Sequence, residues 1–228
     1  EGDSVVEIGP GLGSLTIALA DTGAVVTAVE IDDVLVEVLT ETTAGRDVTV
    51  LHADAMDLDW DSLLGRRRWT LVANLPYNIS VPLICDLLDD VPCIDRMLVM
   101  VQKEVAERLV AAPGDAAYGL PSVKVAYHSR ARIVGRVPPS AFFPRPRVDS
   151  ALVELQRLEA RAVSVDPGLL FDLVRAGFGQ RRKMLRRSLA ALVGPDAFEI
   201  AGVAPTARAE ELGLHDWASL VEAVAVTG

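Results

Sequence analysis

The sequence of 228 residues predicts an α/β fold with a mainly parallel sheet, followed by a small all-helical C-terminal domain. Short β-branched runs alternate with helix-like segments, which is the pattern of a parallel sheet buried on both faces. Half of the residues are hydrophobic, so a sizeable core is available. From Pro167 onward the pattern is purely helical. We therefore expect one domain at residues 1–160 and a helical domain at residues 161–228.

The expected elements follow in chain order. Strands are expected at residues 5–8, 25–29 and 48–51, with helices at residues 14–21 and 33–43 between them. Further elements are a strand at 70–73, a helix at 81–88, a strand at 97–101, a helix at 104–111, an extended segment at 122–134, a Pro-rich loop at 137–148 and a strand at 150–158. The last strands are expected at the sheet edge in antiparallel orientation.

A glycine-rich turn follows the first strand and contains Gly9, Gly11 and Gly13. Such a turn lets the backbone approach a ligand closely, and it serves either a dinucleotide or S-adenosylmethionine. Ser14 stands where the dinucleotide fingerprint has its third glycine, and Glu7 lies inside the preceding strand. This spacing favours a Rossmann-like fold that binds S-adenosylmethionine.

Two acidic residues follow later strands. Glu30 ends the second strand, and Asp54, followed by Ala55, comes just after the third. Ligands of open α/β sheets bind at the carboxyl ends of the strands. There Glu30 can accept hydrogen bonds from ribose hydroxyls and Asp54 from an adenine amine. Either acid alone is typical of a solvated loop, and only the joint pattern with the glycines indicates a cofactor site.

The fourth strand leads into a turn that consists of Asn74, Leu75, Pro76 and Tyr77. This turn indicates methylation of an exocyclic amine on a base. The lone pair of such an amine is delocalised into the ring, so a site must localise it before a methyl group can be transferred. The Asn74 side-chain oxygen and the Leu75 carbonyl can accept the two amine hydrogens. Pro76 keeps the turn rigid, and Tyr77 can stack on the base.

Charge is divided unevenly along the chain, whose net charge is −10. Residues 1–65 hold 14 acidic residues and one basic residue, whereas residues 66–228 hold 18 acidic and 21 basic residues. Binding of a polyanion depends on the local potential within about 8–10 Å. A basic face on the second part of the chain is therefore compatible with a nucleic-acid partner.

Other classes of protein are disfavoured. No apolar run reaches the roughly 18 residues that cross a bilayer, and residues 1–4 are acidic and polar, unlike a signal peptide. Cys85 and Cys93 have no neighbouring His that would complete a metal site, so we expect reduced thiols and no metal. We expect a cytoplasmic protein without membrane contact.

Together these motifs resemble the small-subunit rRNA adenine N6,N6-dimethyltransferases, the KsgA family. Residues 137–150, which read VPPSAFFPRPRVDS, resemble that family's loop before the last strand. Residues 178–186, which read FGQRRKMLR, resemble the signature of its helical C-terminal domain. The resemblance covers nearly the whole chain. Members of the family also carry an N-terminal segment that closes over the cofactor, whereas this chain begins just before its first strand.

The resemblance implies transfer of methyl groups from S-adenosylmethionine to N6 of adjacent adenines in small-subunit rRNA during ribosome biogenesis. It implies cofactor contacts from Gly9, Glu30, Asp54 and Asn74. It also implies that Phe142 covers the face of the adenine opposite the turn, although the residues alone fit a core aromatic beside its Phe neighbour equally well. The implied partner is the immature small ribosomal subunit, and we expect a monomer.

The basic segment after Phe171 is expected to lie on one continuous helix with an apolar stripe. Its basic residues are Arg181, Arg182, Lys183, Arg186 and Arg187. In a helix, Arg182 with Arg186 and Lys183 with Arg187 would be neighbours of like charge, and RNA phosphates would relieve their repulsion. We expect rRNA contacts here. The alternative is a solvated face neutralised by neighbouring acids.

Two other functions stay open. One is a macrolide-resistance type methyltransferase that acts on an adenine of large-subunit rRNA. The other is a non-catalytic rRNA-binding assembly factor, or a transcription factor of mitochondrial type, that keeps the fold as a docking surface. Residues 74–80 and the basic segment weigh against the first function, and the retained cofactor residues weigh against the second.

Overall fold

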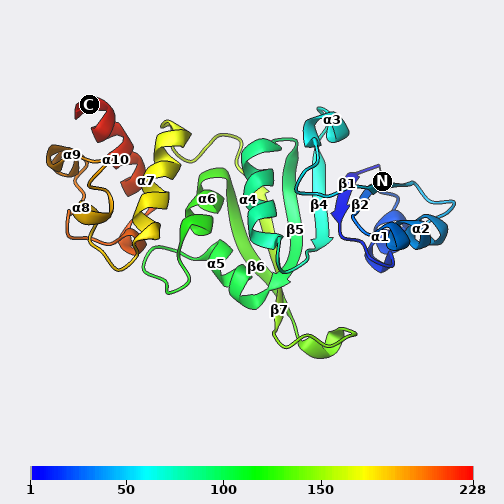
Figure 1. Cartoon of the computed structure of the whole chain (residues 1–228). Coiled ribbons are helices and arrows are strands. Elements are labelled where there is room, and N and C mark those ends of the chain that lie inside the picture. Colours follow the sequence, from blue (N-terminus) through cyan, green and yellow to red (C-terminus); the bar gives the residue numbers. More distant parts are fainter. Residues whose placement is uncertain (1, 228) are drawn as a thin grey trace. The chain divides into compact units, whose positions relative to one another are not determined.

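The structure, a computed structural model, describes residues 2–227 and divides into two compact units. Unit 1 comprises Glu1–Ala106 and Arg130–Arg157, and unit 2 comprises Glu107–Ser129 and Leu158–Gly228. Figure 1 shows the strands of unit 1 and the helices of unit 2 along the chain. Unit 2 includes an internal segment in addition to the C-terminal helices, so no single point along the chain separates the units.

Unit 1 is built on a seven-stranded sheet with the order β3-β2-β1-β4-β5-β7-β6. The strands are β1 Ser4–Ile8, β2 Val25–Glu30, β3 Val48–His52, β4 Trp69–Asn74, β5 Ile94–Gln102, β6 Ser129–Val137 and β7 Ser150–Arg157. The pairs among β1 to β5 are parallel, and β7 runs antiparallel to β5. The predicted mainly parallel sheet is therefore confirmed, and so is an antiparallel strand toward its edge.

The helices between these strands are α1 Ser14–Ala20, α2 Asp33–Thr42, α3 Trp60–Leu64, α4 Ser80–Asp90 and α5 Lys103–Val110. The helices predicted near α1, α2, α4 and α5 are confirmed. The five-residue α3 was not predicted, because it is too short to show an apolar period. The Asp32 carboxylate caps α2 by accepting from the backbone N–H groups of Val34 and Leu35, which explains why that helix begins directly after the turn.

The strand order reverses between β1 and β4, which are neighbours in the sheet. At such a switch point the connections after the two strands turn to opposite faces and leave a crevice at their carboxyl ends. The glycine-rich turn follows β1, and Asn74 is the last residue of β4. Topology alone therefore brings the two strongest sequence motifs together.

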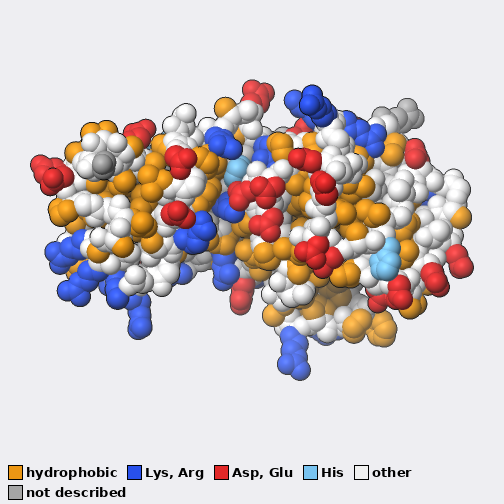
Figure 2. All heavy atoms as spheres, turned by 45° about the horizontal axis from the view of Figure 1, so that its top comes forward, with side chains coloured by type: hydrophobic (Ala, Val, Ile, Leu, Met, Phe, Trp, Pro, Cys, Tyr) orange, Lys and Arg blue, Asp and Glu red, His pale blue; other side chains and the backbone are white. Residues whose placement is uncertain are grey.

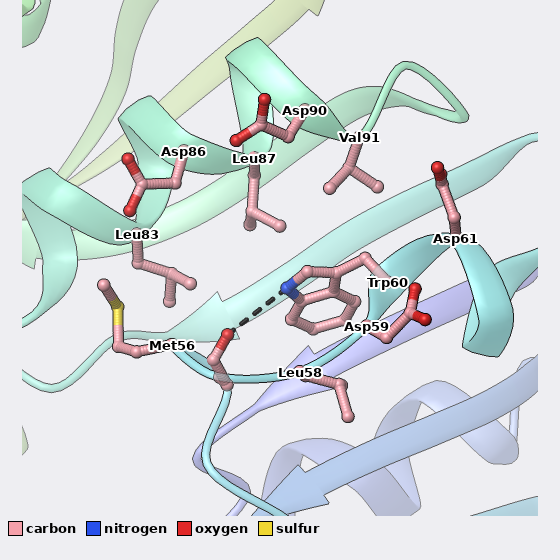
Figure 3. A pocket seen from close by; sticks show the side chains of 11 residues that line it. Met56, Leu58, Asp59, Trp60, Asp61, Leu83, Asp86, Leu87, Asp90 and Val91 are labelled. Carbon is pink, nitrogen blue, oxygen red and sulfur yellow. Dashed lines mark hydrogen bonds between the residues drawn. The ribbon is translucent and has the colours of Figure 1, made fainter.

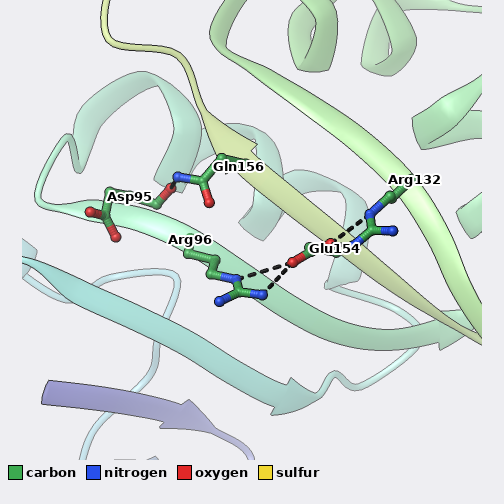
Figure 4. Close-up of polar contacts among 5 residues, drawn as sticks. All are labelled: Asp95, Arg96, Arg132, Glu154 and Gln156. Carbon is green, nitrogen blue, oxygen red and sulfur yellow. Dashed lines mark hydrogen bonds and ion pairs between the residues drawn. The ribbon is translucent and has the colours of Figure 1, made fainter. Parts of the chain in front are cut away.

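Ion pairs and hydrogen bonds tie the antiparallel part of the sheet together. Arg96 of β5 and Arg132 of β6 both donate to the Glu154 carboxylate of β7 (Figure 4). These hydrogen bonds lower the pKa of Glu154. Arg157, at the end of β7, donates to the carbonyls of Leu87, Leu88, Val91 and Ile94. It thereby caps the carboxyl end of α4, the helix that begins just after the Asn74 turn.

Unit 2 is helical and has its own core around the fully buried Trp217, Leu170 and Tyr127. Its elements are α6 Leu120–His128, α7 Pro167–Gly179, α8 Leu185–Ser188, α9 Pro195–Ile200, the 3-10 helix η2 Ala209–Glu211 and α10 Leu214–Thr227. The Asp166 carboxylate caps α7 by accepting from Leu169 N. The purely helical pattern predicted from Pro167 onward is confirmed.

The prediction of an extended segment at residues 122–134 is wrong for its first part. Residues 120–128 form α6, and only β6 from Ser129 onward is extended. The Ser122 hydroxyl accepts from Gly119 N and so caps this helix, and Val123 is buried in the core of unit 2. The β-branched and aromatic residues suggested a strand, but capping and tertiary burial outweigh that preference.

The prediction of one continuous helix through the basic segment is also wrong. Helix α7 ends at Gly179, a turn follows, and α8 begins at Leu185. In the turn, Lys183 N donates to Gln180 O, and Leu185 N donates to Ala207 O. The local turn bond and the long-range bond to Ala207 redirect the chain, so the basic residues lie on a turn and a short helix.

Across residues 2–227, no helix combines the length and the apolar character that spanning a bilayer requires.

Candidate active site

The carboxyl ends of β1, β2 and β3, together with residues after β4, enclose a cavity of about 360 Å³ that we call the strand-end pocket. Its lining residues are Ile8, Gly9, Val29, Glu30, Ile31, Ala53, Asp54, Ala55, Met56, Pro76, Asn78 and Ile79. Four of the predicted cofactor residues, Gly9, Glu30, Asp54 and Ala55, lie in this lining. The other four, Glu7, Gly11, Gly13 and Asn74, do not.

The glycine-rich turn needs glycine for two different reasons. Gly9 has φ +67°, and a Cβ atom there would lie 3.4 Å from Pro76 Cδ, where it would fill the space beside the pocket. Gly13 has φ +85°, and its Cβ would lie 2.7 Å from Leu39 Cδ1 of α2. Gly9 therefore keeps backbone open to a ligand, whereas Gly13 lets α1 begin against α2.

Glu30 ties the strand-end pocket together. Its buried carboxylate accepts from the backbone N–H groups of Gly11 (3.1 Å), Ile31 (2.9 Å) and Asp32 (3.1 Å). An ionised carboxylate has about four acceptor positions, so roughly one is left for a ligand hydroxyl. Glu30 thus both orients the glycine-rich turn and offers an acceptor at the predicted position.

Asp54 is held in a similar way on the other side of the pocket. Its Oδ1 atom accepts from Met56 N at 2.8 Å, which fixes the carboxylate at the start of the turn after β3. Ile31 and Met56 line the pocket with exposed apolar side chains, 61% and 37% accessible. These two residues were not predicted from the sequence. Ile31 directly follows Glu30, and Met56 lies two residues after Asp54, so an apolar residue close behind each strand-end acid was the sequence pattern that could have identified them.

A second cavity of about 300 Å³, the turn pocket, lies beyond β4. Its lining residues are Asn74, Leu75, Pro76, Tyr77, Phe142, Phe143, Pro144 and Pro146. All five residues predicted to handle the target base are in this lining. Pro76 lines both pockets, so the two cavities meet at this residue.

The turn after β4 is fixed by its neighbours. Leu75 is buried, and its N–H donates to Met100 O at 3.1 Å, which extends the pairing of β4 with β5. The Tyr77 hydroxyl and the Ser150 hydroxyl are 3.1 Å apart and hydrogen bonded. Asn74 is exposed at the end of β4. The arrangement therefore presents an amide oxygen and an aromatic ring on a turn whose backbone is anchored.

Glu7 lies beneath the glycine-rich turn and is 1% exposed. Burial raises the pKa of Glu7 to about 7, and the side chain of Thr16 on α1 offsets this rise only in part. Among residues 2–227, neither Glu7 Oε2 nor Thr16 Oγ1 has a partner with hydrogen-bonding geometry. Glu7 is thus a buried carboxyl group that supports the turn from below and does not line the pocket.

An acidic groove of about 310 Å³ adjoins the strand-end pocket and shares Ala55 and Met56 with it. Figure 3 shows Trp60 donating to the Ala55 carbonyl and four aspartates around the apolar floor. Those aspartates are Asp59, Asp61, Asp86 and Asp90. Their charge disfavours a polyanion on this side of the strand-end pocket.

The basic residues of unit 2 divide into two kinds. Arg181 donates to the Glu210 carboxylate at 2.7 Å and to Ala116 O at 2.9 Å. The others, Arg182, Lys183, Arg186 and Arg187, are exposed and form no ion pair among residues 2–227. Figure 2 shows basic side chains gathered on this unit. Arg181 therefore stabilises the unit, and the remaining four are accessible to a partner.

Residues 1–225 match the family model described as "Ribosomal RNA adenine dimethylase". "Ribosomal RNA small subunit methyltransferase A" of Cutibacterium acnes is 45% identical, over 99% of this chain and 80% of its own length. The protein of the same name from Kineococcus radiotolerans is 47% identical, over 96% of this chain and 75% of its own length.

Two solved structures are similar over nearly the whole chain. A dimethyladenosine transferase from Plasmodium falciparum superposes with a TM-score of 0.82 at 27% identity, covering 96% of this chain and 88% of that one. The 23S rRNA methyltransferase ErmE superposes with a TM-score of 0.72 at 25% identity, covering 98% and 91%. With the fold, the glycine-rich turn and the Asn74 turn in agreement, the chain belongs to the ribosomal RNA adenine dimethylase family.

Proposed function

We propose that this chain transfers methyl groups from S-adenosylmethionine to N6 of two adjacent adenines in small-subunit rRNA. The observation that carries this proposal is that Asn74, at the carboxyl end of β4, lines the turn pocket two residues before Pro76, which lines both pockets. A methyl donor in the strand-end pocket and a base in the turn pocket would meet there. The family supports adenine as the target, and the named relatives support the small subunit.

The strand-end pocket fits S-adenosylmethionine in size and in donor set. Its volume lies within the usual range for small-molecule sites, roughly 300–1,000 Å³. Gly9 leaves the backbone open, and the carboxylates of Glu30 and Asp54 face hydroxyl or amine groups from two sides. Ile31 and Met56 offer apolar surface to an adenine ring. Bound there, S-adenosylmethionine supplies a methyl group on a positively charged sulfur, which is a good leaving group.

The Asn74 turn activates the amine. Asn74 Oδ1 and the Leu75 carbonyl accept the two N6 hydrogens, which draws the lone pair out of the ring and toward the methyl donor. After one transfer the amine still has one hydrogen, and the amide oxygen of Asn74 can accept it, so a second transfer is possible. Asn74 is exposed, so the proton released from N6 has water to accept it.

Tyr77 and Phe142 hold the adenine ring from two sides of the turn pocket. This fixes N6 in line with the methyl donor, and positioning of this kind supplies much of the acceleration in group transfer. The exposed basic residues of unit 2 bind rRNA phosphates. We infer that the chain acts as a monomer, in the cytoplasm, on the immature small subunit.

The proposal is tested by incubating the chain with labelled S-adenosylmethionine and with separately purified, unmethylated small and large ribosomal subunits. We expect N6,N6-dimethyladenosine in the small-subunit RNA alone, identified by mass spectrometry of nuclease digests. Methylation of the large subunit would instead support the function named for ErmE. Binding of subunits without any methyl transfer would support a non-catalytic assembly factor.

A further inference from the structure

The segment between β6 and β7 carries an aromatic side chain that no residue among 2–227 covers. Phe143 is 102% exposed, more than any other large hydrophobic residue among residues 2–227. Phe142 has an extended backbone, with φ −118° and ψ 150°, so the two neighbouring rings point to opposite sides. Phe142 is half-buried, whereas Phe143 extends outward at the rim of the turn pocket.

Two cations follow this ring closely in the sequence. Arg145 and Arg147 are exposed, alternate with prolines, and form no ion pair within the described part of the chain. Their situation differs from that of Arg96 and Arg132 on the same unit, whose guanidinium groups both pair with Glu154 (Figure 4). Figure 1 shows the segment projecting from the sheet, and Figure 2 shows hydrophobic and basic side chains together on this projection.

The base of the segment is anchored although its tip is exposed. Lys103 N donates to Asp149 O at 2.9 Å, and Ser150 pairs with Gln102 at the start of β7. The Ser150 hydroxyl also bonds to Tyr77. The exposed ring and the two cations are therefore held at the rim of the pocket that receives the target base.

We propose that Phe143, Arg145 and Arg147 grip the nucleotide that neighbours the target adenine, with its base stacked on Phe143 and the flanking phosphates bound by the two arginines. This inference rests on the proposed function, because it needs an RNA strand in the turn pocket. An exposed aromatic ring followed by two arginines that form no ion pair among the described residues fits single-stranded RNA in both respects: every base has a face that can stack, and the backbone is anionic.

RNA is favoured over an apolar partner by the charges. Contact of Phe143 with an uncharged apolar surface would leave Arg145 and Arg147 without a counter-ion, which is unfavourable. Phosphates at the spacing of neighbouring nucleotides would instead pair with both cations. The surrounding prolines restrict the backbone, so less conformational entropy is lost when the strand binds.

The stacking half of the proposal is tested with Phe143→Ala, Phe143→Leu and Phe143→Trp in the full chain. We expect Phe143→Ala and Phe143→Leu to raise the dissociation constant for unmethylated small subunits and the KM for methylation about tenfold, which is the scale of one lost base–aromatic stack. Phe143→Trp should stay within about threefold of wild type, because it still offers a ring. The dissociation constant for S-adenosylmethionine should not change.

The charge half is tested by the salt dependence of subunit binding. For Arg145→Gln with Arg147→Gln, the slope of log K against log salt should fall by about 1.4, since each single-strand phosphate contact contributes about 0.7. The matched control is Arg46→Gln with Arg68→Gln, which removes the same charge from two arginines that pair with Asp21 and Asp95. The control should keep the wild-type slope.

The outcomes separate this inference from the proposed function. If wild type methylates small subunits and Phe143→Ala does so with unchanged KM, the inference is wrong and the function stands. A Phe143→Leu variant as good as wild type would show apolar contact without stacking, and would also overturn it. If wild type does not methylate small subunits, the proposed function is wrong. In that case the binding measurement still tests this inference: if Phe143→Ala binds small subunits as tightly as wild type does, Phe143 does not bind the neighbouring nucleotide.

Discussion

The strand-end pocket and the turn pocket are built in opposite ways. The first is formed by strand ends whose acids are already held by backbone N–H groups, as Glu30 is by three of them. The second has one wall on an anchored turn and the other on a projecting segment whose Phe143 is fully exposed. The contrast suits the two ligands, because a small cofactor needs a prearranged site and a long RNA strand needs an accessible one.

The largest effect is expected from a variant that removes the amine acceptor in the turn pocket. Asn74→Ala removes the amide acceptor from an exposed position, so the fold should be kept. The methylation rate should fall by roughly 10²-fold or more, the scale seen on losing one group that stabilises a transition state. Rate and thermal unfolding are to be measured on the same preparation. A rate within about threefold of wild type would show that the lone-pair argument is wrong.

The second-largest effect is expected from a variant that weakens cofactor binding in the strand-end pocket. Glu30→Gln replaces one acceptor oxygen by an N–H donor that faces backbone N–H groups, so the glycine-rich turn should loosen. Affinity for S-adenosylmethionine should fall roughly 10–100-fold, because hydrogen bonds to charged groups contribute about 1.5–3 kcal/mol. Calorimetric titration measures this. Glu37→Gln, an exposed acid on α2, is the matched control and should bind as wild type does.

Glu7, beneath the glycine-rich turn, is an exception among the acids of this region, because its buried carboxyl group lacks a complete set of hydrogen-bond partners among the described residues. The third prediction concerns the pH dependence of stability that follows. Burial raises the pKa of Glu7 from its ordinary value of 4.5 to about 7 in the folded protein, so the folded state binds the proton more tightly than the unfolded state does. The free energy of unfolding should therefore fall as pH rises from about 4.5 to 7. In Glu7→Gln that loss should be absent, leaving the variant more stable than wild type at pH 8 by about 1–3 kcal/mol.

Denaturant unfolding at pH 5 and pH 8 measures the Glu7 difference. Parallel pH profiles of wild type and Glu7→Gln would mean that Glu7 is ionised throughout and finds a counter-charge.

The smallest effect concerns the Ser150 anchor of the turn pocket. Ser150→Ala and Tyr77→Phe each remove the same hydrogen bond. Because one hydrogen bond contributes about 0.5–1.5 kcal/mol, each variant should raise the KM for small subunits about two- to tenfold. The double variant should be no worse than the poorer single one, because only one bond is lost. Ser150→Thr keeps a hydroxyl and serves as the control. Additive losses would show that the two side chains act independently.

The sequence predicted the regions with local signals and missed those set by distant contacts. Gly9, Glu30 and Asn74 each stand at the end of a strand, and a parallel sheet brings such positions together without further information. Helix α6 and the break between α7 and α8 depend on burial in unit 2 and on Ala207, far along the chain. The Tyr77 to Ser150 bond joins residues 73 positions apart. Ile31 and Met56 were not predicted, because their role depends on their side chains being exposed in the strand-end pocket, and the sequence does not show which apolar side chains are exposed.

The central claim is that the strand-end pocket binds the methyl donor and that Asn74, in the turn pocket, activates the amine. Single-turnover methylation of small subunits by Glu30→Gln and Asn74→Ala, measured at limiting and at saturating S-adenosylmethionine, tests this claim most directly. Saturating cofactor should restore Glu30→Gln to near the wild-type rate, whereas Asn74→Ala should stay roughly 10²-fold slower at every concentration. Restoration of Asn74→Ala by added cofactor would contradict the account.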